Sequence, residues 1–169
     1  MTERDSTAQA VSYLRVSPKP KNKEVDEYGS IPVQQTATER YAALFNYQIV
    51  KSIEDPDSSA GTALRDRAKG IELLDYLKSS GIKNLIVQRI DRLFRNTADG
   101  LVQMEEWTEE EIAVHFADQG GNMLNCATPE GILCFTTLLG YATFERQMTR
   151  RRTKTSMLEY QKMGKKMGG

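Results

Sequence analysis

The chain is predicted to be an α/β protein, in which a central, mostly parallel sheet is flanked by helices and followed by one long C-terminal helix. Three observations predict this class. Short apolar runs alternate with segments of helical periodicity between residues 10 and 116. Polar loops directly follow the apolar runs, as they do at the carboxyl ends of parallel strands. From residue 129 to about residue 163 the sequence favours helix throughout.

The first half of this alternation begins with a strand from Ala10 to Val16, which is rich in strand-forming residues. A charged loop with two prolines, Pro18 to Gly29, follows it. Gln34 to Phe45 carries apolar residues at helical spacing, and Gln48 to Ile53 reads as the second strand. Serines, prolines and a glycine then make Glu54 to Leu64 a second loop.

The next helix has Asp66 as its expected N-cap and ends near Gly81. Its buried face is predicted to contain Ile71, Leu74 and Leu77. The remaining elements of the alternation are a strand from Asn84 to Gln88, a helix from about Thr97 to Glu110, a strand from Ile112 to Phe116, and a connection rich in glycine and asparagine from Gly120 to Asn125.

The C-terminal helix is predicted to open at Thr128 and Pro129, because proline is favoured in the first helical turn. It runs through Glu145 and stays helix-favourable to about Met163, before Gly164. Its expected buried stripe is Ile132, Phe135, Leu139 and Ala142.

Composition excludes several classes of protein. Cys126 and Cys134 are too few for a disulfide framework or a zinc site, so free and mostly buried thiols are expected. His115, the only histidine, lies in an apolar strand and is expected to be packed rather than catalytic. The polar N-terminus has no apolar signal core and no run is long enough to span a membrane, which favours a cytoplasmic protein.

The formal net charge is zero, but charge is divided unevenly along the chain. Residues 146 to 169 hold eight Lys and Arg against Glu159 alone, a net charge of +7, so the remainder carries −7. A basic segment of this kind indicates either a contact with a polyanion or a solvated helix face. Charge alone leaves both interpretations open.

A serine and several arginines are predicted to meet at one edge of the sheet. Ser17, Asp55 and Asp91 follow strands, which places them at the edge where open parallel sheets bind ligands. Arg15 lies two residues before Ser17 and therefore on the same face of the strand. Other positive groups at this edge are Arg67, Arg92 and Arg95. Guanidinium groups match phosphate oxygens, so the pattern points to a hydroxyl nucleophile that attacks a phosphodiester.

These residues resemble the serine recombinases, a family that includes resolvases, invertases, large phage integrases and transposases. The resemblance covers nearly the whole chain. It is carried by Tyr13, Arg15, Val16 and Ser17; by Ser30, Ile31 and Gln34; by Asp55 and Ser59; by Asp66, Arg67, Leu73 and Leu74; by Asp91, Arg92, Leu93 and Arg95; and by Glu145, Arg146, Arg152 and Thr153.

The resemblance implies that the chain is a site-specific DNA recombinase. Ser17 would attack the scissile phosphate to form a 5′-phosphoserine link. Arg15, Arg67, Arg92 and Arg95 would hold the phosphate oxygens, and Asp91 would orient arginines or assist proton transfer. Tyr13, Gln34, Asp55, Ser59, Glu145 and Arg146 would occupy supporting positions. Arg150, Arg152 and Lys154 would contact DNA.

The resemblance also implies partners and domain organisation. The partners would be double-stranded recombination sites and further copies of the chain, as a dimer in solution and a tetramer in synapsis, in a prokaryotic or phage-encoded setting. No metal or cofactor is implied. Residues 1–147 would form the catalytic domain and residues 148–169 the long helix and the start of a linker. No helix-turn-helix or zinc module follows, which suggests a catalytic-domain fragment or a natural short form.

Several positions depart from the family pattern. The loop from Pro18 to Gly29 is long and lacks the glutamine that usually follows the nucleophile. Arg65 and Arg67 compete for one family arginine, and the preceding Asp66 favours Arg67. Thr149 stands where a hydrophobic residue is expected and Arg151 where an acid is common, changes that would loosen subunit contacts.

Two other functions are compatible with the fold class. The first is a DNA-binding regulator of the same fold that does not cut, although an intact Ser17 and its arginines argue against it. The second is a phosphatase or nucleotide hydrolase, but the sequence lacks a Gly-rich phosphate loop, a Cys-x5-Arg loop and a metal-binding acid cluster.

Overall fold

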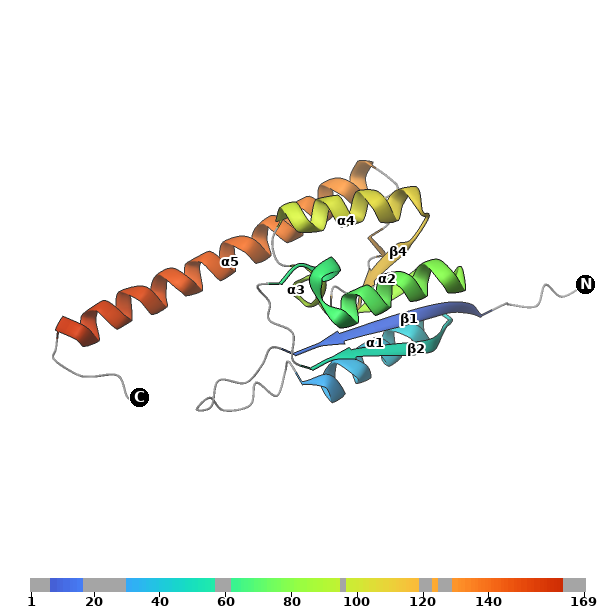
Figure 1. Ribbon diagram of the computed structural model, residues 1–169, viewed down its shortest axis with the longest axis horizontal. Helices are drawn as coiled ribbons and strands as arrows, with labels where there is room; N and C mark the ends of the chain where they lie inside the picture. The colour runs from blue at the N-terminus through green and yellow to red at the C-terminus, as the bar shows by residue number, and fades with distance from the viewer. Residues whose placement is uncertain are drawn as a thin grey trace, which may run out of the picture.

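The computed structural model describes residues 7–16, 30–56, 62–94, 97–118, 123–124 and 129–162. Its centre is a five-stranded sheet in the order β2-β1-β3-β4-β5, parallel except for β5. Figure 1 shows β1 and β2 side by side in this sheet. The strands are β1 (Ala8–Arg15), β2 (Tyr47–Asp55), β3 (Asn84–Val87), β4 (Ala113–Phe116) and β5 (Met123–Leu124). The helices are α1 (Ile31–Leu44), η2 (Leu64–Asp66, a 3-10 turn), α2 (Ala68–Ser80), α3 (Ile90–Leu93), α4 (Thr97–Glu109) and α5 (Pro129–Lys162). The predicted α/β class and the parallel pairing are confirmed.

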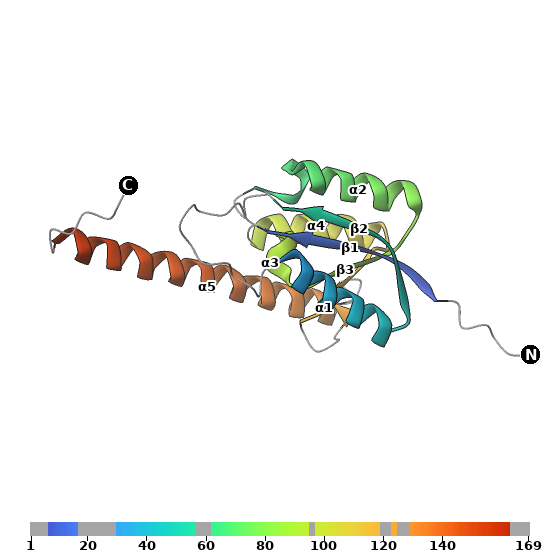
Figure 2. The same ribbon diagram turned by 90° about the horizontal axis from the view of Figure 1, so that it is seen from below.

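The helices cover both faces of the sheet. α1 packs on one face, where Tyr41 and Ala42 contact Ala10 and Ile86 in a small core. α2, α4 and α5 pack on the other face in a larger core, so that α1 and α2 lie on opposite sides of β1 (Figure 2). Alternate residues of one strand therefore enter different cores, as the two-residue period of a strand requires.

Two helix starts differ from the sequence-based prediction. α1 begins at Ile31 rather than Gln34, because Pro32 is tolerated in the first turn, where its missing N–H costs nothing. The predicted N-cap Asp66 is wrong: it lies in the turn η2, and the N-cap of α2 is Arg67. The bonds from Asp66 N to Ala63 O (3.0 Å) and from Arg67 N to Leu64 O (3.2 Å) close this turn before the helix begins.

Three further sequence-based predictions need correction. The buried residues of α2 include Leu73 and Leu77, whereas Ile71 is 47% exposed, because the buried face of the helix centres on Gly70, Leu73 and Leu77. Cys134 is exposed rather than buried. The connection after β4 contains β5, which pairs antiparallel with β4 through Met123 and Leu124.

The long C-terminal helix is confirmed as α5, whose 34 residues span about 50 Å. Phe135 and Leu139 anchor its first part in the core, as predicted, but Ile132 of the expected stripe is 48% exposed. The second half projects away from the body (Figure 1). Within the described residues, no helix combines the length and the apolar character needed to cross a membrane.

Candidate functional site

The candidate site lies at the carboxyl edge of the sheet, where β1 ends at Arg15 and β2 ends at Asp55. Arg15 and Asp55 are direct partners in the register of these strands. The short helix α3 follows β3 at the same edge and supplies Asp91 and Arg92. Three elements that are distant in sequence thus meet at the edge where open parallel sheets bind ligands.

Arg15 is buried, with 1% of its surface exposed. Its Nε donates to the main-chain oxygen of Arg92 (3.0 Å), and its Nη2 donates to that of Asp91 (2.8 Å). These carbonyls are at the end of α3, where main-chain oxygens have no hydrogen-bond donor within the helix. Arg15 therefore ties the end of β1 to the end of α3.

Gln34 fixes the backbone of Arg15. Its Oε1 accepts from Arg15 N and its Nε2 donates to Arg15 O, each over 3.0 Å. The Gln34 side chain is fully buried in α1 and occupies the hydrogen-bonding position that another strand would take. The main chain at Arg15, two residues before Ser17 in the sequence, is therefore held in a defined position.

Arg67 is buried beside Arg15, with 2% of its surface exposed. Its Nε donates to Thr62 O (2.9 Å), and its Nη1 donates to Arg92 O (3.1 Å) and, over 3.4 Å, to the hydroxyl of Tyr13. Its Nη2 is buried and has no hydrogen-bond partner among the described residues. One edge of the guanidinium group is thus available to a ligand.

Tyr13 links Arg67 to a carboxylate. Its hydroxyl donates to Asp55 Oδ2 over 2.5 Å. Burial, together with this bond, raises the pKa of Tyr13 well above its ordinary value, so the phenol stays neutral. Asp55 itself is 4% exposed.

Arg92 and Asp91 complete the described part of the site. Arg92 Nη2 lies 3.9 Å from Asp91 Oδ2, and Arg89 Nε lies 3.1 Å from Asp91 Oδ1. The Nε of Arg92 is buried and has no hydrogen-bond partner among the described residues. Arg89 was not predicted as part of the site, because only the short turn of α3 brings it back to Asp91.

The electrostatics of this cluster favour an anion. Arg15, Arg67 and Arg92 bring three positive charges together, and Asp55 and Asp91 supply two negative charges. Burial, reinforced by the neighbouring charges of Arg67 and Arg92, lowers the pKa of Arg15 to about 10. A phosphate would relieve the excess charge and accept hydrogen bonds from Arg67 Nη2 and Arg92 Nε.

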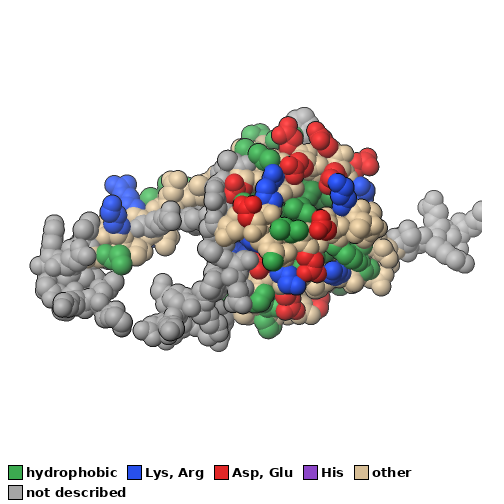
Figure 3. Space-filling view, in the orientation of Figure 1, with side chains coloured by type: hydrophobic (Ala, Val, Ile, Leu, Met, Phe, Trp, Pro, Cys, Tyr) green, Lys and Arg blue, Asp and Glu red, His purple; other side chains and the backbone are tan. Residues whose placement is uncertain are grey.

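The remaining predicted residues fall into two groups. Ser17, Ser59 and Arg95 lie outside the described residues, as do the side chains of Glu145, Arg146 and Arg150. Arg152 and Lys154 are exposed on the projecting half of α5, where Figure 3 shows basic side chains. Of the two arginines that compete for one family position, Arg67 lies in the cluster, while Arg65 makes an exposed ion pair with Glu106 (3.2 Å).

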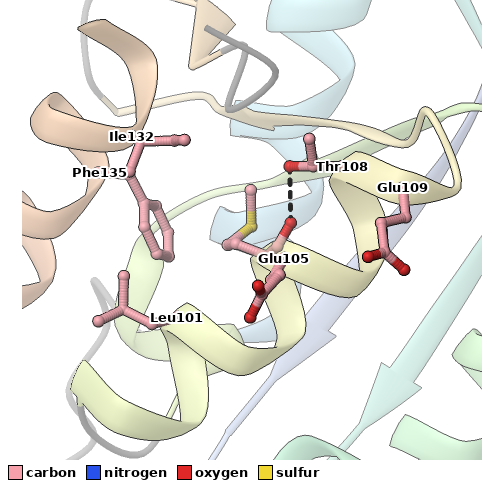
Figure 4. A pocket seen from close by; sticks show the side chains of 7 residues that line it. Leu101, Glu105, Thr108, Glu109, Ile132 and Phe135 are labelled. Atoms are coloured by element: carbon pink, nitrogen blue, oxygen red, sulfur yellow. Dashed lines mark hydrogen bonds between the residues drawn. The ribbon is translucent and has the colours of Figure 1, made fainter. Parts of the chain in front are cut away.

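Other surfaces have a different character. Acidic side chains gather over α4 in Figure 3. Between α4 and α5 lies a pocket of about 310 Å³, lined mainly by apolar side chains such as Leu101 and Phe135, with Glu105 and Glu109 at its side (Figure 4). It contains none of the predicted site residues. No cluster of three or more potential metal ligands occurs among the residues that the structure describes.

Comparisons with a family model and with individual proteins indicate the same protein family. A family model described as the resolvase N-terminal domain matches residues 10–166. The transposon Tn2501 resolvase of Escherichia coli is 31% identical over 110 residues, which cover 65% of this chain and 55% of the relative. Serine recombinase PinR of Escherichia coli K12 has the same identity over 65% of this chain and 54% of its own. The chain thus spans about half the length of these relatives.

Solved structures share the fold. The N-terminal catalytic domain of TP901-1 integrase superposes with a TM-score of 0.60 at 22% identity, covering 83% of this chain and 98% of that domain. A resolvase family site-specific recombinase from Streptococcus pneumoniae superposes with a TM-score of 0.59 at 20% identity, covering 92% and 99% of the two chains. At these identities the likeness establishes the arrangement of the sheet and helices.

Proposed function

The chain belongs to the resolvase family of serine recombinases, and from this premise we propose that it cuts and rejoins DNA at specific sites. The observation that carries the proposal is the cluster that the buried Arg15 and Arg67 form with the partly buried Arg92 at the carboxyl edge of the sheet. Two of its guanidinium nitrogens, Arg67 Nη2 and Arg92 Nε, have no hydrogen-bond partner among the described residues. Ser17 follows Arg15 by two residues.

The reaction is a transfer of a phosphoryl group between two oxygens. Ser17 Oγ loses its proton, in a transfer that Asp91 is proposed to assist, and forms a bond to the phosphorus; the bond from phosphorus to the 3′ oxygen breaks, and the 3′ oxygen gains a proton and leaves as a hydroxyl. One phosphate ester replaces another, so the reverse attack by a 3′ hydroxyl rejoins DNA without a nucleoside triphosphate. The DNA end with the 5′ phosphate remains attached to Ser17.

The arginines act on the charge that develops at the phosphate. Arg67 and Arg92 present their unpaired nitrogens to the nonbridging oxygens, and Arg95 is proposed to join them. Because these groups are fixed before the substrate arrives, they do not need to reorganise during the reaction. Arg15 contributes its positive charge and holds the α3 carbonyls in place, and Asp91 orients Arg92.

The projecting half of α5 is proposed to contact the DNA backbone. Arg152 and Lys154 are exposed there, and Arg150 lies in the same turn. Contacts with phosphates depend on salt, because each one releases counterions from DNA. Strand exchange would proceed in a tetramer assembled on two sites, from subunits that are dimers in solution.

A covalent adduct tests this function. The full-length protein is incubated with fragmented DNA from its source genome, denatured with detergent, and the DNA that stays attached is sequenced from its 5′ ends. We expect adducts at defined sites and none with Ser17→Ala. Specific DNA binding without an adduct in the wild-type protein would instead support a regulator that does not cut. Release of inorganic phosphate without an adduct would support a hydrolase.

A further inference from the structure

Arg67 is held by hydrogen bonds to three residues. Its Nε and Nη1 are bonded to the main-chain oxygens of Thr62 and Arg92, and Nη1 also reaches Tyr13. The guanidinium group has five N–H donors in a fixed plane, so these contacts fix the direction of the remaining Nη2 donors. Nη2 is buried and unpaired among the described residues.

The contact with Tyr13 depends on where the phenolic proton points. A hydroxyl has one proton to donate, and an ionised carboxylate only accepts. Asp55 Oδ2, at 2.5 Å, therefore accepts the hydrogen bond from the Tyr13 hydroxyl, and a lone pair of the phenolic oxygen is left for Arg67 Nη1 at 3.4 Å. Without Asp55 the hydroxyl proton could turn toward the guanidinium group and oppose it.

The contacts that run from Asp55 through Tyr13 to Arg67 also leave the positive charge of Arg67 available to a ligand. A carboxylate in direct contact with Arg67 would neutralise the group that the phosphate needs. Because a neutral phenol stands between Asp55 and Arg67, the arginine is oriented while its charge remains available to a ligand. The raised pKa of Tyr13 is consistent with this neutral form.

We propose that Asp55 and Tyr13 are positioning residues that aim Arg67 at the scissile phosphate. This inference rests on the proposed function and deepens it, because it assigns to two residues of the β1–β2 edge a role in the reaction that they perform only through Arg67. Neither side chain needs to touch DNA.

A double-mutant cycle separates this role from simple packing between β1 and β2. The rate of adduct formation is measured at saturating protein for Tyr13→Phe, Arg67→Ala and the double variant, on a site recovered from the adduct screen. Tyr13→Phe keeps the ring and removes one hydrogen bond, so we expect a loss of about tenfold. Arg67→Ala is expected to lose at least about a hundredfold.

The cycle has one decisive comparison. If Tyr13 acts through Arg67, Tyr13→Phe changes the rate by less than about twofold when Arg67 is already alanine. An equal loss in both backgrounds overturns the proposal. Asp55→Asn, which keeps the size of the side chain, is expected to show the same dependence on Arg67.

A matched control and a second substrate complete the test. Tyr41→Phe also removes a buried hydroxyl, one that contacts His115 instead, and should leave the rate of adduct formation unchanged. A methylphosphonate at the scissile position lacks the charge that Arg67 meets, so the losses caused by Arg67→Ala and Tyr13→Phe should both shrink on it. If the methylphosphonate reduces the loss caused by Arg67→Ala but leaves the loss caused by Tyr13→Phe unchanged, the proposed role of Tyr13 is overturned. Absence of any adduct with the wild-type protein would instead refute the proposed function, and the inference with it.

Discussion

The surroundings of His115 predict how strongly the stability of the protein depends on pH. The imidazole is fully buried on β4, and burial lowers its pKa to about 4. The hydroxyl of Tyr41 lies 3.1 Å from Nδ1, and Asn84 Oδ1 lies 3.3 Å from Nε2. Since Asn84 Oδ1 can only accept, Nε2 carries the proton, and Nδ1 accepts from Tyr41.

The direction in which the free energy of unfolding changes with pH follows from the protonation states of His115 in the folded and unfolded chain. In the unfolded chain a histidine has a pKa of about 6.5, so between about pH 6.5 and pH 4 the unfolded state binds the additional proton and the folded state does not. The free energy of unfolding therefore falls as the pH falls through this window. A difference of about 2.5 pKa units corresponds to about 3 kcal/mol.

The perturbation is His115→Gln, because glutamine can bond to Tyr41 and Asn84 but does not titrate. Urea unfolding is measured for both proteins at several values from pH 8 to pH 4. The wild-type protein is expected to lose about 3 kcal/mol more than the variant over this range. Carboxylates titrate in both proteins, so their effect cancels in the comparison. Parallel curves for the two proteins would refute the assignment of a buried, neutral His115.

Three further predictions concern the site and the helices packed around it. Gln34→Ala leaves a buried N–H and C=O at the end of β1 without their partners, so we expect a loss of about 2–5 kcal/mol in urea unfolding and slower adduct formation. Gly70→Ala places a Cβ against the main-chain oxygen of Leu64, so it should lower the free energy of unfolding by about 1–3 kcal/mol. Gly140→Ala is the control and should not destabilise the protein, because its Cβ meets no atom within 4 Å. Equal effects of the two substitutions would contradict this packing. Arg65→Ala removes only an exposed ion pair, so thermal unfolding and the rate of adduct formation should both stay close to the wild-type values; a large drop in rate would place Arg65 in the site.

Much of the fold could be predicted because its signals are local. The strand and helix alternation from residue 8 to residue 116 follows from apolar periodicity, and parallel pairing follows from the helices between strands. The edge of the sheet where Arg15, Asp55 and Asp91 meet follows in turn from the rule that strand ends in such a sheet lie together. His115 was correctly predicted to be a packed residue for the same reason.

The sequence-based predictions that proved wrong concern features that depend on contacts between residues distant in the sequence. Asp66 has the chemistry of an N-cap, but the turn η2 closes first and moves the start of the helix beyond it. Ile71 and Ile132 fit an apolar stripe, yet they remain about half exposed because no described element covers them. β5 has only two residues and gains its order from pairing with β4.

By itself, the sequence determined the fold class, the edge of the sheet that carries the site, and the residue types of the site, because these depend on periodicity and on side-chain chemistry. Only the tertiary structure decided that Arg67 rather than Arg65 enters the cluster, that Gln34 holds the backbone of Arg15, and that Asp55 reaches Arg67 through Tyr13. The direction of a guanidinium group is set by partners from several strands and turns. No pattern within one segment of the sequence contains that information.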